Sequence, residues 1–266
     1  MFNLPAREHR SFIMGNPPIV RAVVQIVFPP AMRLATPEGA AELQDLLGGL
    51  FQMEPAEQDA ALRISFGNPG HATQGFQFRH ADGYRLSVTT ENIVLTIDHR
   101  YSDRAAFANV LETALSAVRQ VGKVTEYLRV GVRYINAAPA SIGDFRTWFK
   151  PEFTGWAGGE ILGADSHRTW VLITQINRDN LDSPITTGVV RYGYVPTGVG
   201  SDVTVSAAGT HPSFIADIDL GSQRPAIFDV VALLELFRTI NHEVAALFEH
   251  TLSDDGASHF ALAAKE

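Results

Sequence analysis

The chain has no cysteine among its 266 residues. Disulfides, thiolate metal sites and cysteine nucleophiles are therefore excluded together. The absence of thiols is consistent with a reducing compartment, so the composition predicts a cytoplasmic protein.

Basic residues are also few, with 21 Lys and Arg against 29 Asp and Glu, a net charge of −8 and a pI near 5.6. A general binder of nucleic acid or of anionic membranes would carry a basic surface. We therefore predict neither nucleic-acid nor membrane binding.

Long hydrophobic runs are missing as well. Residues 1–15 contain no apolar run of signal-peptide length. The most apolar stretch, 227–252, is interrupted by charged and polar residues, which predicts an amphipathic helix of a soluble protein rather than a membrane span.

Recognisable catalytic motifs are absent too. No G-x-S-x-G nucleophile elbow occurs. The glycine-rich segments 155–159 and 198–201 do not continue into the Lys-Ser/Thr start of a phosphate-binding helix. His242 and His250 are eight residues apart, whereas a helical zinc site needs four. We therefore predict no cofactor and no metal, and a binding protein rather than an enzyme.

What the sequence does contain is an internal echo. Residues 127–138 repeat the pattern of 19–30 at an offset of 108, which places Val132 over Val24 and Arg129 over Arg21. The echo predicts a chain built twice on one plan, with Val24 and Val132 both buried.

The order of predicted elements repeats in the same way. In the first half a strand precedes a helix that starts at Thr36-Pro37-Glu38, four alternating strands and a long helix capped by Asp103. The second half has a strand, a short helix with Ser141 as its cap, a glycine-rich connection, four strands and a final helix. The predicted strands are 62–66, 76–78, 84–88 and 93–97, then 127–136, 168–177, 186–195, 202–207 and 213–220; the second-half helices are 142–150 and 226–252, and the connection is 154–165.

This order predicts an α+β fold of two tandem strand–helix–four-strand–helix lobes, 1–123 and 124–266, packed as one compact unit. It resembles the helix-grip and TATA-binding-protein-like class, in which curved antiparallel sheets wrap long helices. The clean alternation of the strands predicts one buried and one solvated sheet face.

Several segments carry a closer likeness. The chain resembles a sporadically distributed, uncharacterised prokaryotic protein family of similar length, and R-x-G-x-R-Y-I-N is the most specific shared motif. The matching segments are Pro18-Ile19-Val20-Arg21-Ala22, Arg129 to Asn136, Ile218-Asp219, Ile240-Asn241-His242, Phe248-Glu249 and Thr251. The resemblance implies a soluble prokaryotic protein and supplies no activity, cofactor or catalytic residue.

Arg129 and Arg133 share one face of a predicted strand, on either side of Gly131. Two guanidiniums so placed could grip a carboxylate or phosphate, with the glycine letting it approach the backbone. The alternative is a solvated face paired with acids on neighbouring strands.

Two further groups of residues are candidate sites, one for a metal ion and one for a protein partner. Asp217 and Asp219 share a strand face, as a Mg²⁺ site would require, although such carboxylates more often meet water or an arginine. Trp148, Phe153 and Trp156 lie in a connecting segment, where they either fill the core or form an apolar partner surface.

Together these features predict a binding or adaptor protein that acts through protein–protein contacts, possibly with its own copy as the partner. The first alternative is a small-ligand binder or enzyme that uses a sheet cavity and the Arg129/Arg133 face. The second is an accessory protein of a prokaryotic defence or toxin–antitoxin system, an idea that rests on the sporadic family alone.

Overall fold

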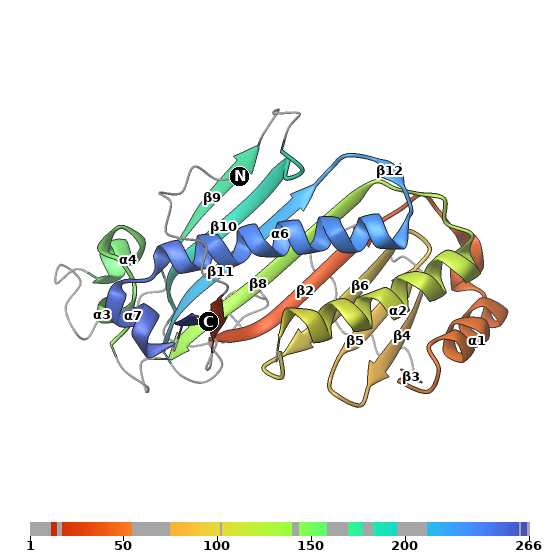
Figure 1. The fold of residues 1–266 in the computed structure, drawn as a ribbon, viewed down its shortest axis with the longest axis horizontal. Helices are drawn as coiled ribbons and strands as arrows, with labels where there is room; N and C mark the ends of the chain where they lie inside the picture. The colour runs from red at the N-terminus through yellow and green to blue at the C-terminus, as the bar shows by residue number, and fades with distance from the viewer. Residues whose placement is uncertain are drawn as a thin grey trace.

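The computed structural model is built around one large antiparallel sheet with long helices packed across it (Figure 1). It describes residues 12–14, 18–54, 75–101, 103–139, 144–158, 170–177, 183–195, 212–260 and 262–264. Within these ranges no helix is long and apolar enough to cross a membrane.

The large sheet has nine strands in the order β3-β4-β5-β6-β2-β8-β11-β10-β9, and every neighbouring pair is antiparallel. The first half of the chain supplies five of the strands and the second half four. Their bounds are β2 Ile19–Val27, β3 Phe51–Glu54, β4 Gly75–His80, β5 Arg85–Thr89, β6 Asn92–Asp98, β8 Arg129–Pro139, β9 Trp170–Asn177, β10 Thr187–Val195 and β11 Ser213–Ser222.

The two echoed segments form neighbouring strands in the middle of this sheet. β2 pairs with β8, and Val24 lies directly opposite Val132. Both side chains are buried, at 1% and 0% exposure, which confirms the burial predicted from the echo. The strands of each half then follow outwards from this central pair.

One residue of β2 departs from the predicted alternation. The register shifts between Ile19 and Arg21, so Val20 forms a bulge. Val20 therefore packs on the opposite face from Ala22, beside Ile135, whereas strict period-two alternation would place both on the same face.

The helices begin where the sequence places caps. Thr36 accepts a hydrogen bond from the Gly39 amide and starts α1 Pro37–Leu46, and Asp103 accepts one from the Ala106 amide and starts α2 Arg104–Gly122. Both predicted caps are confirmed. Asp229 caps the last long helix, α6 Val230–Thr251, which therefore begins later than residue 226.

α2 and α6 lie side by side across the same face of the sheet (Figure 1). Phe107 of α2 stacks on Phe237 of α6, with ring centroids 5.6 Å apart. The apolar side chains of β2, β8 and β11 fill the space between helices and sheet, so one continuous core spans both halves of the chain.

The region after β8 differs from its prediction. α3 Phe145–Trp148 is shorter than predicted, and its cap is Asp144, whose side chain accepts from the Arg146 amide. α4 Pro151–Gly158 occupies the start of the predicted glycine-rich connection. Gly155, at φ 47°, lets this helix kink.

Some predicted elements cannot be compared with the structure. The predicted strands 62–66 and 202–207, and Ser141, lie outside the described residues. β3 was not predicted, because its four residues offer too short an alternation to be recognised.

Smaller elements complete the fold. A short 3-10 helix, Met32–Ala35, precedes α1, and α7 Asp254–His259 packs against α3. Two small ribbons pair β1 Phe12–Met14 with β13 Leu262–Ala264, and β7 Glu126–Tyr127 with β12 Ala226–Ile227. The first ribbon joins segments near the two chain ends.

Candidate functional site

The arginine and aspartate candidates lie together on the sheet face opposite α2 and α6, which we call the polar face. Its central residues come from four strands: Gln25, Arg129, Arg133, Arg191, Asp217 and Asp219. Period-two alternation sends Val130, Val132 and Tyr134 of β8 to the helix side, so the arginines between them point the other way.

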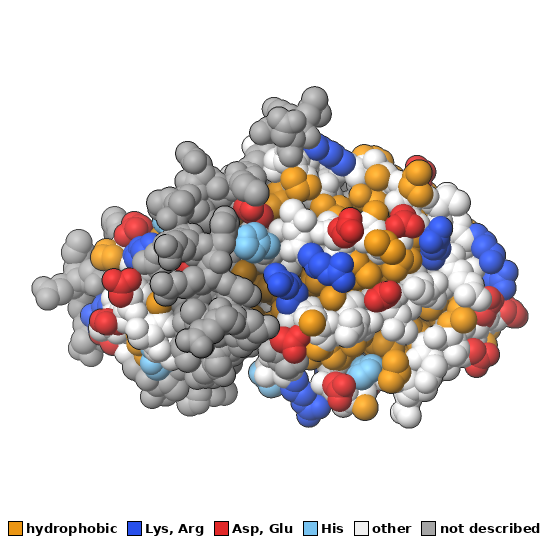
Figure 2. Space-filling model, viewed as in Figure 1, with side chains coloured by type: hydrophobic (Ala, Val, Ile, Leu, Met, Phe, Trp, Pro, Cys, Tyr) orange, Lys and Arg blue, Asp and Glu red, His pale blue; other side chains and the backbone are white. Residues whose placement is uncertain are grey.

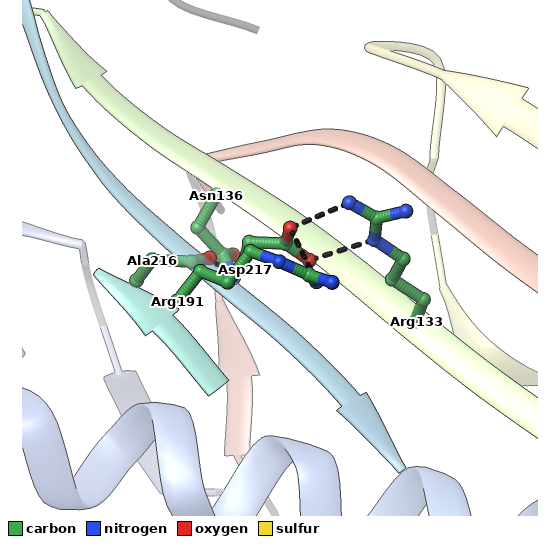
Figure 3. A network of polar contacts seen from close by, with 5 residues as sticks. All are labelled: Arg133, Asn136, Arg191, Ala216 and Asp217. Atoms are coloured by element: carbon green, nitrogen blue, oxygen red, sulfur yellow. Dashed lines mark hydrogen bonds and ion pairs between the residues drawn. The ribbon is translucent and has the colours of Figure 1, made fainter. Parts of the chain in front are cut away.

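The strongest contact on this face joins Arg133 to Asp217. The guanidinium donates two hydrogen bonds, from Nε to Oδ1 at 2.8 Å and from Nη2 to Oδ2 at 2.6 Å (Figure 3). Both side chains are buried. Such two-point pairing is the most favourable geometry for an arginine and a carboxylate, so it holds Arg133 in one place.

Arg191 reaches the same carboxylate from the other side. It lies opposite Asp217 in the β10–β11 register, and its Nη1 is 3.4 Å from Oδ2 (Figure 3). Sequence reasoning did not identify Arg191, because a single arginine in an alternating strand carries no motif. Only the pairing of β10 with β11 places it here.

Asp219 is the unusual residue of the polar face. It lies opposite Arg133 in the β8–β11 register and is only 4% exposed. Among the buried side-chain atoms of the described residues, its Oδ1 is the one without a hydrogen-bond partner. Burial raises the pKa of Asp219 to about 7, with a further upward effect from Asp217, although Arg129 and Arg133 act against the rise.

Arg129 lies beside this carboxyl group. Its Nη1 donates to Oε1 of Gln25 at 2.9 Å. Burial lowers the pKa of Arg129, while the nearby Asp219 acts to raise it. Its guanidinium lies over Gly131 and Gly221, because an added Cβ at either position would come within 3.1 to 3.7 Å of Nη2. The space over Gly131 is thus filled by the Arg129 side chain, whereas the sequence predicted that a ligand would approach the backbone there.

The polar face is not the solvated surface that alternation predicts. Gln25, Thr96, Arg133 and Asp217 are all buried. On the outer strands the alternation holds, and Arg79 and Arg85 are exposed. Strands at the centre of a wide sheet can be buried on both faces, and the sequence pattern alone does not show which strands are central.

A divalent cation is a poor match for the two aspartates. Two guanidiniums already contact the Asp217 carboxylate, so a cation there would face two positive charges. No group of three His, Asp or Glu side chains suited to a metal occurs in the described part of the chain.

The three aromatic candidates lie at the α3–α4 end of the fold. Trp148 is 5% exposed and stacks on His259 with ring centroids 4.1 Å apart, so it is a core residue and is not available as a partner surface. Phe153 is half-buried against Tyr192 and His250. Trp156 lies in α4, but its side chain is outside the described residues.

Three exposed apolar side chains lie at the opposite end of the sheet, which we call the apolar end. Ile227 is 75% exposed, Val231 63% and Leu128 38%. Ile227 lies opposite Glu126 in the β7–β12 ribbon. Leu128 follows two positions after Glu126, and Val231 is in the first turn of α6. Figure 2 shows hydrophobic side chains among charged ones at this end, where Figure 1 labels β12.

Comparison with protein-family models gives no match for this chain, and comparison with curated proteins gives none at a significant level. The resemblance to a sporadic prokaryotic family therefore stays a prediction.

Proposed function

We propose that the chain is a non-enzymatic binding protein that contacts a partner protein through the apolar end. The observation that carries this proposal is the gathering of Leu128, Ile227 and Val231, all exposed, at the junction of β7, β12 and α6. Clustered exposed apolar side chains are typical of protein–protein contact sites.

The chemistry of the chain favours a partner other than a second copy. Two copies would each carry a net charge of −8 and would repel one another. The apolar end itself carries both signs, with exposed Lys123 and Glu126 and with Arg119 3.9 Å from Asp229. The expected partner therefore presents an apolar surface with a polar rim of mixed charge.

The test is a double substitution, Ile227→Asp with Val231→Asp, compared with Met53→Asp at the exposed β3 edge. Exposed positions tolerate such changes within about 0.5 kcal/mol of stability. Loss of contact anchors should weaken binding by about 2 kcal/mol or more. Each tagged variant is used to capture partners from the native host, and every captured protein is then purified and titrated against it.

A partner that binds the unmodified chain and Met53→Asp, but not the double variant, supports the proposal. If every partner binds all three proteins equally, the apolar end is not the contact surface. Size-exclusion chromatography with light scattering tests the remaining alternative, which is a dimer of the unmodified chain that the double variant disrupts.

A second candidate function is the binding of a small ligand on the polar face. The specific observation in its favour is Asp219, a buried carboxyl group with an unpartnered oxygen and a pKa near 7. Perturbed acids of this kind concentrate at functional sites. The defence or toxin–antitoxin hypothesis stays a prediction.

We also propose that the fold arose by internal duplication in the tandem order predicted from the echo. The central β2–β8 pair supports this, since a two-fold axis relating residues 108 apart would pass between Val24 and Val132. One long helix from each half lies on the same sheet face (Figure 1). An experimental structure in which residues 19–122 and 129–251 fail to superpose would contradict the duplication.

A further inference from the structure

The unpartnered oxygen of Asp219 requires a physical account. A buried polar atom that lacks a hydrogen bond costs about 1–3 kcal/mol, and native proteins retain few of them. Oδ1 of Asp219 is such an atom in the described part of the chain, and the residue lies in the middle of the sheet rather than at a frayed end. This position is therefore expected to serve a bound group.

The charges around Asp219 indicate what kind of group that is. On the polar face, Arg129, Arg133 and Arg191 surround Asp217 and Asp219. Asp217 contacts two of these arginines, and Arg129 donates to Gln25. The charges that act on Asp219 are those of the three arginines and of Asp217. When Asp219 is protonated, positive charge therefore exceeds negative charge around it, so the cluster attracts an anion and repels a cation.

We propose that protonated Asp219, together with the positive charge of Arg129, binds a small oxyanion such as a carboxylate or a sulfate-type group. The acid proton of Asp219 would be donated to an anion oxygen, which gives its carboxyl group the hydrogen bond it lacks. Arg129 supplies the compensating charge from β8.

Proton uptake and anion binding must then be coupled. The pKa of Asp219 is about 7 because burial disfavours its charged form. An anion next to Asp219 disfavours that form further, so binding raises the pKa again. Other charged groups on the surrounding strands are Arg21 and Asp98, which pair with each other at 2.7 Å at the far side of β2. Affinity is therefore expected to fall as the pH rises above 7, by up to about tenfold for each pH unit.

The experiment titrates sulfate and acetate into the full chain at pH 6.5, 7.5 and 8.5, because neither probe titrates in this range. Ionic strength is held constant with chloride, and binding is followed by NMR chemical shifts. We expect affinity to decrease steadily with pH. Asp219→Asn keeps a donor at the site without a titrating group, so it should bind equally at all three pH values, close to the unmodified chain at pH 6.5.

Two matched variants isolate the groups involved. Asp98→Asn removes a carboxyl group outside the cluster of Asp217 and Asp219 and should keep the pH dependence of the unmodified chain. Arg129→Gln removes the proposed charge and should lower affinity more than tenfold at every pH. If no probe binds at pH 6.5, or if Asp219→Asn keeps the pH dependence, the proposal is wrong.

A direct measurement covers the case in which Asp219→Asn fails to fold. The carboxyl carbon of Asp219 in the unmodified chain is titrated by NMR with and without sulfate, and we expect a higher apparent pKa with sulfate. An unchanged pKa would overturn the proposal. An acidic peptide that binds while sulfate and acetate do not would also overturn it, since the anion would then belong to a partner protein. None of these outcomes depends on the apolar end.

Discussion

The two faces of the nine-stranded sheet are both buried near its centre, yet different interactions hold them. On the helix side, Val24, Val132 and Ile218 pack under α2 and α6 in one apolar core. On the polar face, the same strands bury Arg133, Asp217 and Asp219. Burial of each apolar group on the helix side stabilises the folded state. On the polar face, burial of charged groups costs desolvation free energy, which ion pairing must offset.

This difference indicates a division of roles between the faces. A buried ion pair is a poor source of stability compared with apolar side chains of the same volume. The polar face also contains an acid whose Oδ1 lacks a hydrogen bond and whose pKa lies near 7, a combination that no residue of the helix side shows in the described part of the chain. We infer that the helix side is the main source of stability, and that the polar face is suited to a small ligand rather than to the protein contact proposed at the apolar end.

The largest expected effect comes from a charge placed on the helix side. Val132→Asp would put an unpaired carboxylate opposite Val24, where both residues are buried. The cost is several kcal/mol, which is comparable with the total stability of many domains. Urea denaturation followed by circular dichroism should show a severely destabilised or unfolded chain. Gln175→Asp, at an exposed position of β9, is the control and should change stability by less than about 0.5 kcal/mol.

A smaller but still large effect is expected from breaking the ion pair of the polar face. Arg133→Ala removes the two-point contact from Asp217 and leaves that carboxylate buried with Arg191 3.4 Å away. Loss of one partner of a buried pair costs about 3–5 kcal/mol. Replacing both residues, Arg133→Met with Asp217→Leu, should restore most of the lost stability. If the single variant is as stable as the unmodified chain, this face is not held by the ion pair.

The last effect concerns Asp219 and, unlike the other two, depends on pH. Its folded-state pKa of about 7 lies above the value of about 3.9 expected for an unfolded chain. The folded state therefore holds the proton more tightly, and its contribution to stability is complete below pH 4 and is lost as the pH rises through 7. Each pKa unit corresponds to about 1.4 kcal/mol, so the loss amounts to a few kcal/mol.

Asp144 acts in the opposite direction, because burial acts to raise its pKa but hydrogen bonds and charge from Arg146 outweigh burial and lower the pKa. The measurement is therefore the difference in unfolding free energy between Asp219→Asn and the unmodified chain, at several pH values from 4 to 8. That difference should move in favour of the variant as the pH rises. A constant difference would mean that Asp219 has an ordinary pKa, and the two faces would then differ less than we infer.

Much of the α+β fold follows from local patterns in the sequence. Thr36 and Asp103 cap the helices that they were predicted to cap, because short-range hydrogen bonds to backbone amides decide helix starts. Period-two alternation predicts β4, β5, β6, β9, β10 and β11 close to their observed bounds. The burial of Val24 and Val132 also follows from pattern alone.

Only the tertiary structure decides how the polar face is assembled. Arg133, Arg191 and Asp217 come from three separate strands, and their meeting depends on sheet order and register. Alternation predicts that this face is solvated. Because the central strands are buried on both faces, the face instead contains a buried acid, Asp219, with a raised pKa. Likewise, Trp148 becomes a core residue through its contact with His259 of α7, more than 100 positions away. Local sequence determines helix starts and strand faces because these depend on near neighbours, whereas desolvation and charge pairing depend on which distant segments pack together.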